Sequence, residues 1–299
     1  MKNNILSVSE KDLAYMFPKL PDRANKGSMG RVLCICGSYD GRGLSMCGAA
    51  YFSAMAAYRC GAGIVEIFTP RKNYESLAAL VPEAVFSLYE YEENEADVCA
   101  RLLESMKRAS STVLGCGIGK SDMSRAIVDC VLKNVNCPLL IDADGLNLIS
   151  ENMSVLNSLD VEQRKRTVIT PHPGEMMRLC GKSIAEILDS TVETALEMSK
   201  KNGVVCLLKD HNTVITDGEL VYINQSGNAG MATAGMGDVL AGMIGALLAR
   251  SRRDGDVIRA AASGAYLHGL AGDIAAEKTG MYSLTASDVL SQISMVIPR

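Results

Sequence analysis

Short apolar runs alternate with longer segments of helical periodicity between residues 31 and 209. The runs predict strands at residues 31–36, 64–68, 112–116, 139–142, 168–170 and 204–209. The segments between them predict helices at residues 46–60, 96–109, 121–134 and 192–202. Nearly continuous Val, Ile, Leu and Cys are typical of strands covered on both faces. The alternation therefore predicts a three-layer α/β/α fold, with a mostly parallel sheet between two layers of helices.

The pattern changes after Lys209. Residues 213–216 and 220–223 flank Asp217-Gly218, a dipeptide that favours a two-residue hairpin turn. We therefore expect an antiparallel hairpin near the C-terminal end of the sheet. Further helices are predicted at residues 238–249, 257–277 and 286–295. No Pro- or Ser-rich linker and no repeat interrupts the chain, so we expect one domain over residues 1–299.

The charge balance limits the classes of ligand. Lys and Arg total 30 and Asp and Glu total 34, which gives a net charge of −4. A general nucleic-acid-binding protein usually carries a basic excess, so we expect no nucleic-acid partner. A single nucleotide is compatible with this charge, since a few backbone N–H groups can hold a phosphate.

The sequence also bears on location and on cysteine chemistry. Residues 1–13 lack the apolar segment of a signal peptide, and the apolar run 239–249 is too short to span a bilayer. We therefore expect a cytoplasmic protein with no membrane partner. The ten cysteines show no CxxC spacing. We expect the closest pair, Cys34 and Cys36, to be small buried hydrophobic residues rather than a disulfide or a zinc site.

Glycines and ionisable residues follow five of the predicted strands. These segments are Gly37-Ser38, Gly115–Gly119, Asp142-Ala143-Asp144, Pro171–Glu175 and Lys209-Asp210-His211. In open parallel sheets, ligands bind beyond the carboxyl ends of the strands. We therefore expect a ligand site at this edge of the sheet.

The glycine-rich segment 227–238, GNAGMATAGMGD, leads into an apolar helix. Glycines at a helix start let backbone N–H groups approach an anion, and the helix dipole favours negative charge there. Asp238 could be a plain N-cap of this helix. It could equally lie over a phosphate and take a proton from a hydroxyl that attacks the phosphate.

Two residues of the Pro171–Glu175 segment each have two readings. His172 lies between two prolines that fix its direction, as a ligand contact or as a turn histidine bonded to backbone. Glu175 could be an ordinary carboxylate of a first helical turn. It could also hold a nucleotide-bound Mg²⁺ through water.

The remaining polar residues at this edge are ambiguous when taken singly. Asp142 and Asp144 either cap the helix that begins near Gly145 or face a ligand. Lys209 either steers a phosphate or is a solvated lysine at the rim. His211 has no distinguishing context, and His268 is expected to pack in the core of an apolar helix with its ring satisfied.

Two nucleotide motifs are excluded. GCGIGKS lacks the four residues that a P-loop places between its first Gly and its Gly-Lys pair. Gly115–Gly119 fits a G-x-G-x-G turn, but the full dinucleotide fingerprint does not follow it.

The chain resembles the ADP/ATP-dependent NAD(P)H-hydrate dehydratases of the ribokinase-like superfamily, from about Lys26 to the C-terminal helix. The resemblance rests on KGSMGRVLCICGS, GAAYFSAMAAYRCGAGIV, GCGIG, IDADGLN, TPHPGE, LLKDHNTVI, GNAGMATAGMGDVLAGMI and AYLHGLAGD. It implies a ribokinase-like fold and an enzyme that removes water from hydrated NADH or NADPH, consuming ADP or ATP in the presence of Mg²⁺. The implied reaction is phosphoryl transfer to the hydrate hydroxyl followed by loss of phosphate.

The resemblance also implies roles for individual residues. Asp238 would be the catalytic base, and the amides of Gly235, Met236 and Gly237 would form an anion hole. The hydrated cofactor would contact Ala49, Gly115, Gly117, His172 and Asp238. The AMP part of the nucleotide would contact Lys209, Asp210, His211, Asn212, Thr213 and Gly237. Ala49 and Thr213 follow from the resemblance only.

Three residues depart from the family pattern. Asp210 stands where the family usually has Gly, Cys116 where it has Pro, and Met236 where it has Ser or Thr. The fused epimerase domain of some relatives is absent, which favours dehydration without epimerisation and ADP over ATP as donor. The family also implies a homo-oligomer, namely a tetramer.

Two other functions compete with dehydration. A hydroxymethylpyrimidine or thiazole kinase of the same fold would use Asp238 in the same way but release a phosphorylated product; TPHPGE argues against it. The three departures leave open a nucleotide-binding protein without turnover.

Overall fold

A ten-stranded sheet runs through the middle of the molecule in the computed structural model, which describes residues 5–40, 43–251 and 256–298. The strand order is β1-β10-β9-β8-β7-β6-β5-β2-β3-β4. The strands span Ile5–Leu6 (β1), Arg31–Ile35 (β2), Ile64–Pro70 (β3), Val85–Tyr89 (β4), Ser111–Leu114 (β5), Leu139–Ile141 (β6), Thr167–Ile169 (β7), Val205–Leu208 (β8), Thr213–Thr216 (β9) and Val221–Asn224 (β10).

Neighbouring strands are parallel except at β8–β9 and β9–β10, which are antiparallel. The predicted hairpin is therefore present, but its turn is longer than the two residues expected. Thr216 pairs with Val221, so four residues form the turn. Asp217 Oδ1 accepts hydrogen bonds from the N–H groups of Glu219 and Leu220, and Gly218 adopts φ +95°. The Asp-Gly pair thus lies inside a four-residue turn, which the Asp217 side chain stabilises.

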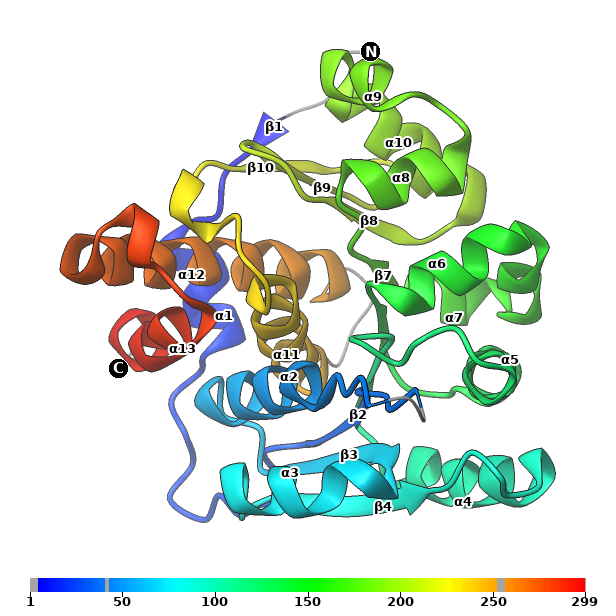
Figure 1. Cartoon of the computed structure of the whole chain (residues 1–299). Coiled ribbons are helices and arrows are strands. Elements are labelled where there is room, and N and C mark those ends of the chain that lie inside the picture. Colours follow the sequence, from blue (N-terminus) through cyan, green and yellow to red (C-terminus); the bar gives the residue numbers. More distant parts are fainter. Residues whose placement is uncertain (1–4, 41–42, 252–255, 299) are drawn as a thin grey trace.

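Helices cover both faces of the sheet (Figure 1). One layer contains α1 (Glu10–Met16), α2 (Cys47–Arg59), α3 (Tyr74–Leu80), α11 (Met236–Leu248), α12 (Asp256–Thr279) and α13 (Ala286–Val296). The other contains α4 (Glu95–Arg108), α5 (Asp122–Asn134), α6 (Asp144–Glu151), α7 (Val161–Lys165), α8 (Pro173–Cys180), α9 (Ile184–Asp189) and α10 (Thr191–Asn202). Short 3₁₀ turns lie at Arg71–Asn73, Met153–Ser158, Ala229–Met231 and Met281–Ser283. This is the predicted three-layer architecture.

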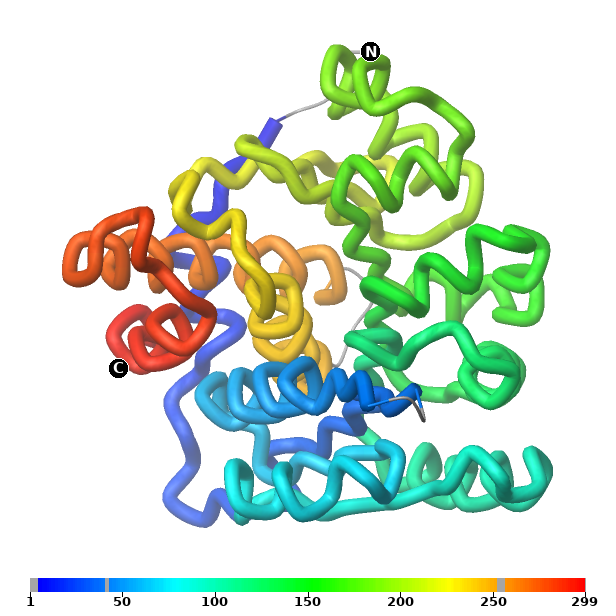
Figure 2. Tube along the Cα trace, viewed as in Figure 1, coloured from blue at the N-terminus to red at the C-terminus, as the bar shows by residue number. Residues whose placement is uncertain are grey.

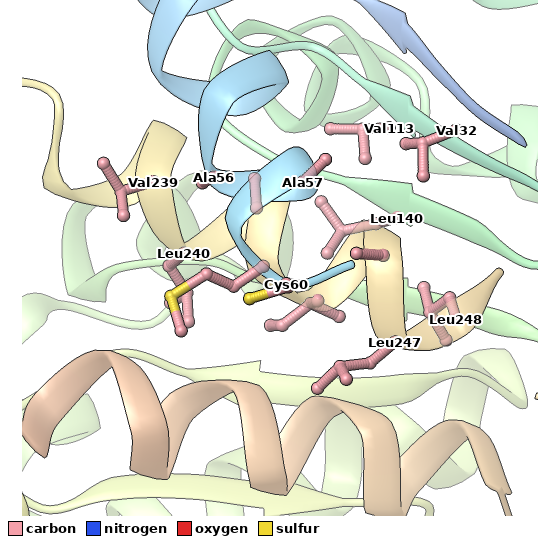
Figure 3. Packing of buried hydrophobic residues seen from close by; sticks show 14 of the residues in the cluster. Val32, Ala56, Ala57, Cys60, Val113, Leu140, Val239, Leu240, Leu247 and Leu248 are labelled. Atoms are coloured by element: carbon pink, nitrogen blue, oxygen red, sulfur yellow. The ribbon is translucent and has the colours of Figure 1, made fainter. Parts of the chain in front are cut away.

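The strands separate two hydrophobic clusters, because successive side chains point to opposite faces. In β2, Val32 and Cys34 belong to the α2/α11 side and Leu33 and Ile35 to the α4/α5 side. Figure 3 shows Val32 and its neighbours from β5 and β6 pointing at α2 and α11. All ten cysteines are free thiols, and Cys34 and Cys36 are fully buried, as predicted.

Six regular elements were not predicted: β1, α1, α3, β4, α7 and α9. β1 has only two residues, and β4 is an edge strand whose Val85 is exposed, so neither has a long apolar run.

No helix in the described ranges is long and apolar enough to cross a membrane.

Glycine lets α11 and α2 approach closely. A Cβ on Gly242 would lie 2.1 Å from the Ser53 carbonyl oxygen, whereas nothing lies within 4 Å of a Cβ on Gly48 of α2. We expect Gly242→Ala to lower the free energy of unfolding by about 1–3 kcal/mol, because backbone must move. Gly48→Ala, the matched control, should raise it by about 0.5–1 kcal/mol. Urea denaturation checks both, and equal effects would contradict the close packing.

Candidate functional site

A cavity of about 990 Å³ opens at the carboxyl ends of β5, β6, β7 and β8, where the sequence predicts a ligand site. Gly117, Asp142, His172 and Lys209 enter it from the loops after these four strands. The opposite wall comes from the segment between β10 and α11, yellow in Figure 2, and from α11 and α12. The cavity therefore gathers the glycines and ionisable residues that the chain spreads over more than a hundred positions.

The N-terminus of α11 opens into this cavity. Gly235 is the N-cap residue, with φ +87°, and no side chain caps the helix. A Cβ at Gly235 would lie 2.8–2.9 Å from Phe52 and Ala286, so this position requires glycine. The free N–H groups of the first turn and the helix dipole make an anion site. Gly235, Met236 and Gly237 all line the cavity.

Asp238 lies in the first turn of α11, three residues after the N-cap, so the plain N-cap reading is wrong. Its side chain lines the cavity. Burial raises the pKa of Asp238 to about 7, and the Asp142 charge adds to the rise. A hydrogen bond from the Cys116 thiol and the charge of Lys209 act in the opposite direction. A carboxylate with a pKa near neutrality is suited to accept a proton at physiological pH.

Lys209 joins two acidic residues behind the N-terminus of α11. Its Nζ lies 2.8 Å from Asp142 Oδ1 and 3.9 Å from Glu175 Oε2. Burial acts to lower the pKa of Lys209, but the two carboxylates outweigh burial and raise it. A Cβ on Gly237 would lie 3.6 Å from the Lys209 Nζ. The lysine is therefore a half-buried cation beside the anion site, not a solvated rim residue.

His172 and Glu175 close the start of α8 with a reciprocal capping box. The N–H groups of Gly174 and Glu175 donate to His172 Nδ1, and the His172 N–H donates to Glu175 Oε2. This confirms that His172 is bonded to backbone and that Glu175 is a carboxylate of the first helical turn. Both residues also line the cavity. Because Nδ1 accepts these bonds, the ring proton sits on Nε2, 3.4 Å from Glu175 Oε1. Burial lowers the pKa of His172 and raises that of Glu175.

Asp142 and Asp144 do not cap α6, whose N-cap residue is Ala143. Asp142, 2% exposed, pairs with Lys209, and Asp144 Oδ2 accepts from the Gly119 N–H at 2.9 Å. Both residues line the cavity. Ala143 between them has φ 50° and ψ −118°, a positive-φ conformation that is strained for alanine.

The two residues expected from the resemblance alone, Ala49 and Thr213, also line the cavity. So do Asp210 and His211, which are exposed at its rim. Gly115 and Asn212 lie outside the lining that the described residues form. A Cβ on Gly115 would lie 2.1 Å from the Asp142 carbonyl oxygen, so this glycine lets two loops approach beneath the cavity.

Several lining residues were not singled out as ligand contacts. They include Met46, Asn147, Asn224, Ser226, Gly227, Asn228, Thr233 and His268. The polar run after β10 was a usable signal for Asn224, Ser226 and Asn228. His268 is buried as expected, but its ring is not satisfied, since Nε2 has no hydrogen-bond partner within the described chain. Its place in the cavity wall depends on how α12 packs, which no local pattern specifies.

Together these groups can perform phosphoryl transfer. The N-terminus of α11 and Lys209 can hold phosphate oxygens, and Asp238 can take the proton of an attacking hydroxyl. Among the described residues no group of three or more His, Cys, Asp or Glu forms a metal site.

Comparisons with known proteins agree with this geometry. The chain is 36% identical over 286 residues to the bifunctional NAD(P)H-hydrate repair enzyme Nnr of Coxiella burnetii, covering 94% of this chain but 54% of that protein. It is 32% identical to the ADP-dependent (S)-NAD(P)H-hydrate dehydratase of Neisseria meningitidis, covering 89% of this chain and 84% of that one. The chain thus spans about half the length of the bifunctional relative.

A solved structure indicates the superfamily of the chain, and a family model indicates its family. The crystal structure of a ribokinase-like superfamily protein from Enterococcus faecalis superposes with a TM-score of 0.83 at 27% identity, covering 98% of this chain and 95% of that chain. The family model described as NAD(P)H-hydrate dehydratase matches residues 32–295. The chain therefore belongs to the NAD(P)H-hydrate dehydratase family, within the ribokinase-like superfamily.

Proposed function

We propose that this protein dehydrates the S form of hydrated NADH and NADPH to NADH and NADPH, a metabolite-repair reaction of a hydro-lyase. ADP is the proposed donor, and AMP and phosphate are the products. The observation that carries the proposal is the Asp238 carboxyl, with a pKa of about 7, beside the uncapped N-terminus of α11 in a cavity of about 990 Å³. The relatives' activities support it.

Asp238 begins the proposed reaction. Its carboxylate takes the proton of the hydrate hydroxyl, whose oxygen attacks the terminal phosphorus of the nucleotide. The bond between that phosphorus and the bridging oxygen breaks, and AMP leaves with the electron pair. The phosphorylated hydrate then loses phosphate and a ring proton, which restores the dihydropyridine.

The other cavity residues bind and neutralise charge. The Gly235, Met236 and Gly237 amides face the developing phosphate charge, and Lys209 supplies a positive charge behind them. The 209–213 segment and Gly237 hold the AMP part, while Ala49, Gly117 and His172 contact the hydrate. Gly115 and Asn212, outside the lining, act through the loops that they shape. Asp210 at the exposed rim can turn toward solvent.

Magnesium fits this donor set as a companion of the nucleotide. Lys209 already neutralises Asp142, whereas Glu175 Oε1 lies 3.4 Å from Nε2 of the His172 ring. Glu175 would hold the ion through water, and the ion would supply charge neutralisation of the phosphates. A cytoplasmic location, one domain and a homotetramer remain predictions of the same proposal.

The pH dependence follows from Asp238. Below its pKa of about 7 the carboxyl is protonated and cannot accept the hydroxyl proton. We expect kcat/KM for the hydrate to fall tenfold per pH unit below about pH 7 and to level off above it. Initial rates from pH 5.5 to 9 at saturating nucleotide check this. A flat profile down to pH 5.5 would contradict the role of Asp238 as base.

A further inference from the structure

Met46 presents an exposed apolar side chain in the wall of the cavity. Its exposed fraction is 42%, and among the exposed large hydrophobic residues of the described chain it alone lines the cavity. Exposed apolar side chains scattered singly over a surface are ordinary. One that lines a ligand cavity differs from these, because a bound ligand removes it from water and so gains binding free energy.

Both ends of the Met46 side chain lie beside Gly117, which lines the cavity too. A Cβ on Gly117 would lie 3.1 Å from Met46 Cβ, 3.5 Å from Met46 Cε and 2.9 Å from Ala49 Cβ. Gly117 has φ +63°, a left-handed conformation that glycine adopts without strain. Met46, Ala49 and Gly117 therefore form one continuous apolar surface of the cavity wall.

The backbone of Met46 fixes the place of this side chain. The Met46 N–H donates to the Ser38 carbonyl at 2.9 Å, and the Met46 carbonyl accepts from the Ala49 N–H at 3.2 Å. Met46 is also the N-cap residue of α2, and it makes no side-chain capping hydrogen bond. Ser, Thr, Asp or Asn would stabilise the helix at this position. The chain thus places an apolar side chain at the cavity where local stability favours a polar one.

The same face of α2 leads to the proposed base. Ala49 follows Met46 by three residues and Ser53 follows Ala49 by four, so the three residues share one face of the helix. Ser53 Oγ donates to the Asp238 carbonyl at 3.2 Å. With a rise of about 1.5 Å per residue, Met46 lies roughly 10 Å along α2 from Ser53. A substrate whose reacting hydroxyl is at Asp238 can therefore extend along this face toward Met46.

The chemistry of this surface suits an uncharged ring. The hydrated nicotinamide ring carries no charge, so an apolar side chain can cover it without removing a charge from water. Phosphates and ribose hydroxyls would lose hydrogen bonds to water against the same surface. A methionine is suited to such a contact, because its unbranched side chain adapts to the outline of its neighbour.

We propose that Met46 is a specificity-determining residue whose side chain packs on the hydrated nicotinamide ring. This rests on the proposed function, which already assigns Ala49 and Gly117 to the hydrate. It adds an apolar contact that is exposed to water in the free protein and becomes buried when the hydrate binds.

Fluorescence titration with NADH, the proposed product, tests the contact without requiring turnover. Saturating AMP, the other product, fills the nucleotide part of the cavity. We expect Met46→Ala to weaken NADH binding by about 3- to 10-fold, because the ring loses its apolar cover. Met46→Gln should lose as much, since it keeps the length of the side chain but must give up water. Met46→Leu should stay within about twofold of the wild type, because Leu supplies a similar apolar volume.

Reduced nicotinamide mononucleotide shows which part of the ligand Met46 contacts. It carries the same ring as NADH without the adenosine, so Met46→Ala should weaken its binding by the same factor. A loss seen with NADH but not with reduced nicotinamide mononucleotide would place the contact at the adenosine and overturn the proposal. Unchanged affinity for both ligands in Met46→Ala and Met46→Gln would overturn it as well.

Controls separate the contact from a structural role. Met295→Ala removes a methionine of α13 that is 59% exposed and outside the cavity lining, and it should change neither affinity. Thermal melting without ligand shows whether each variant folds. Calorimetry with Mg-ADP should give the wild-type affinity for every variant. A loss of Mg-ADP affinity in Met46→Ala equal to its loss of NADH affinity would show a general distortion of the cavity and overturn the proposal.

Steady-state rates separate the Met46 contact from the proposed function. Met46→Ala should raise KM for the hydrate by about 3- to 10-fold and leave kcat within about twofold, because the contact is the same in the ground state and the transition state. Wild-type protein that gives no rise at 340 nm and binds no NADH would overturn the proposed function itself. Wild-type turnover with unchanged KM in Met46→Ala would overturn only the Met46 contact.

Discussion

Asp238→Asn is expected to lower kcat for hydrate dehydration by about 10²- to 10⁴-fold, the usual contribution of a positioned general base. Asn has nearly the same shape as Asp but cannot take the proton of the hydrate hydroxyl. Nucleotide affinity should stay within about threefold, because the amides of α11 and Lys209 are unchanged. Rates at 340 nm and calorimetric titration with Mg-ADP measure the two quantities. Retained kcat would show that another group is the base.

Asp238→Asn should also change the stability of the fold in a way that depends on pH. Since the folded-state pKa of Asp238 is raised from 3.8 to about 7, the charged carboxylate destabilises the fold above pH 7, and this cost vanishes below pH 4. Asp238→Asn removes the cost, so its melting temperature should exceed that of the wild type at pH 8. The difference should shrink as the pH falls to 4. A difference of opposite sign at pH 8 would contradict the buried environment of the carboxyl.

Lys209→Met is expected to impair both stability and nucleotide binding. It leaves Asp142, 2% exposed, and Glu175, 5% exposed, without their cation. Breaking a buried pair from one side typically costs about 3–5 kcal/mol. Loss of a charge-assisted contact to phosphate should weaken Mg-ADP binding by about 10- to 100-fold. Urea denaturation and calorimetry measure the two effects.

Two companion variants separate these effects. Lys209→Met combined with Asp142→Asn should recover most of the stability, because fewer charges stay buried, but it should not recover nucleotide affinity. Lys107→Met removes an exposed pair with Glu104 and should cost at most about 0.5 kcal/mol. Recovery of affinity in the double variant would show that Lys209 acts only through Asp142 and not on the phosphates.

The sheet and much of the site are predictable from local patterns because both depend on strand ends. Runs such as Val32–Ile35 are apolar on both faces, and the residues after each strand reach one edge whatever the details of packing. The glycines before Asp238 likewise indicate an anion site from the sequence alone. The edge strand β4 has no such run, and a two-residue strand such as β1 gives no periodic signal.

The site features that local sequence patterns do not predict depend on contacts between distant segments. His172 and Glu175 serve as helix caps and cavity lining at once, a double role that sequence reasoning treats as alternatives. His268 belongs to an apolar helix, and only the packing of α12 against the segment after β10 places its ring in the cavity. Gly115 was expected to contact the ligand, but it lies beneath the site, where two backbones approach each other closely.

The most direct test of the proposed repair activity is absorbance at 340 nm with purified protein, Mg²⁺ and chemically prepared NADH hydrate, with ADP or ATP added separately. The proposed reaction predicts a rise that requires a nucleotide, is faster with ADP and is lost in Asp238→Asn. No rise with either nucleotide, from protein that calorimetry shows to bind Mg-ADP, would contradict dehydration and favour a kinase that phosphorylates a hydroxylated heterocycle.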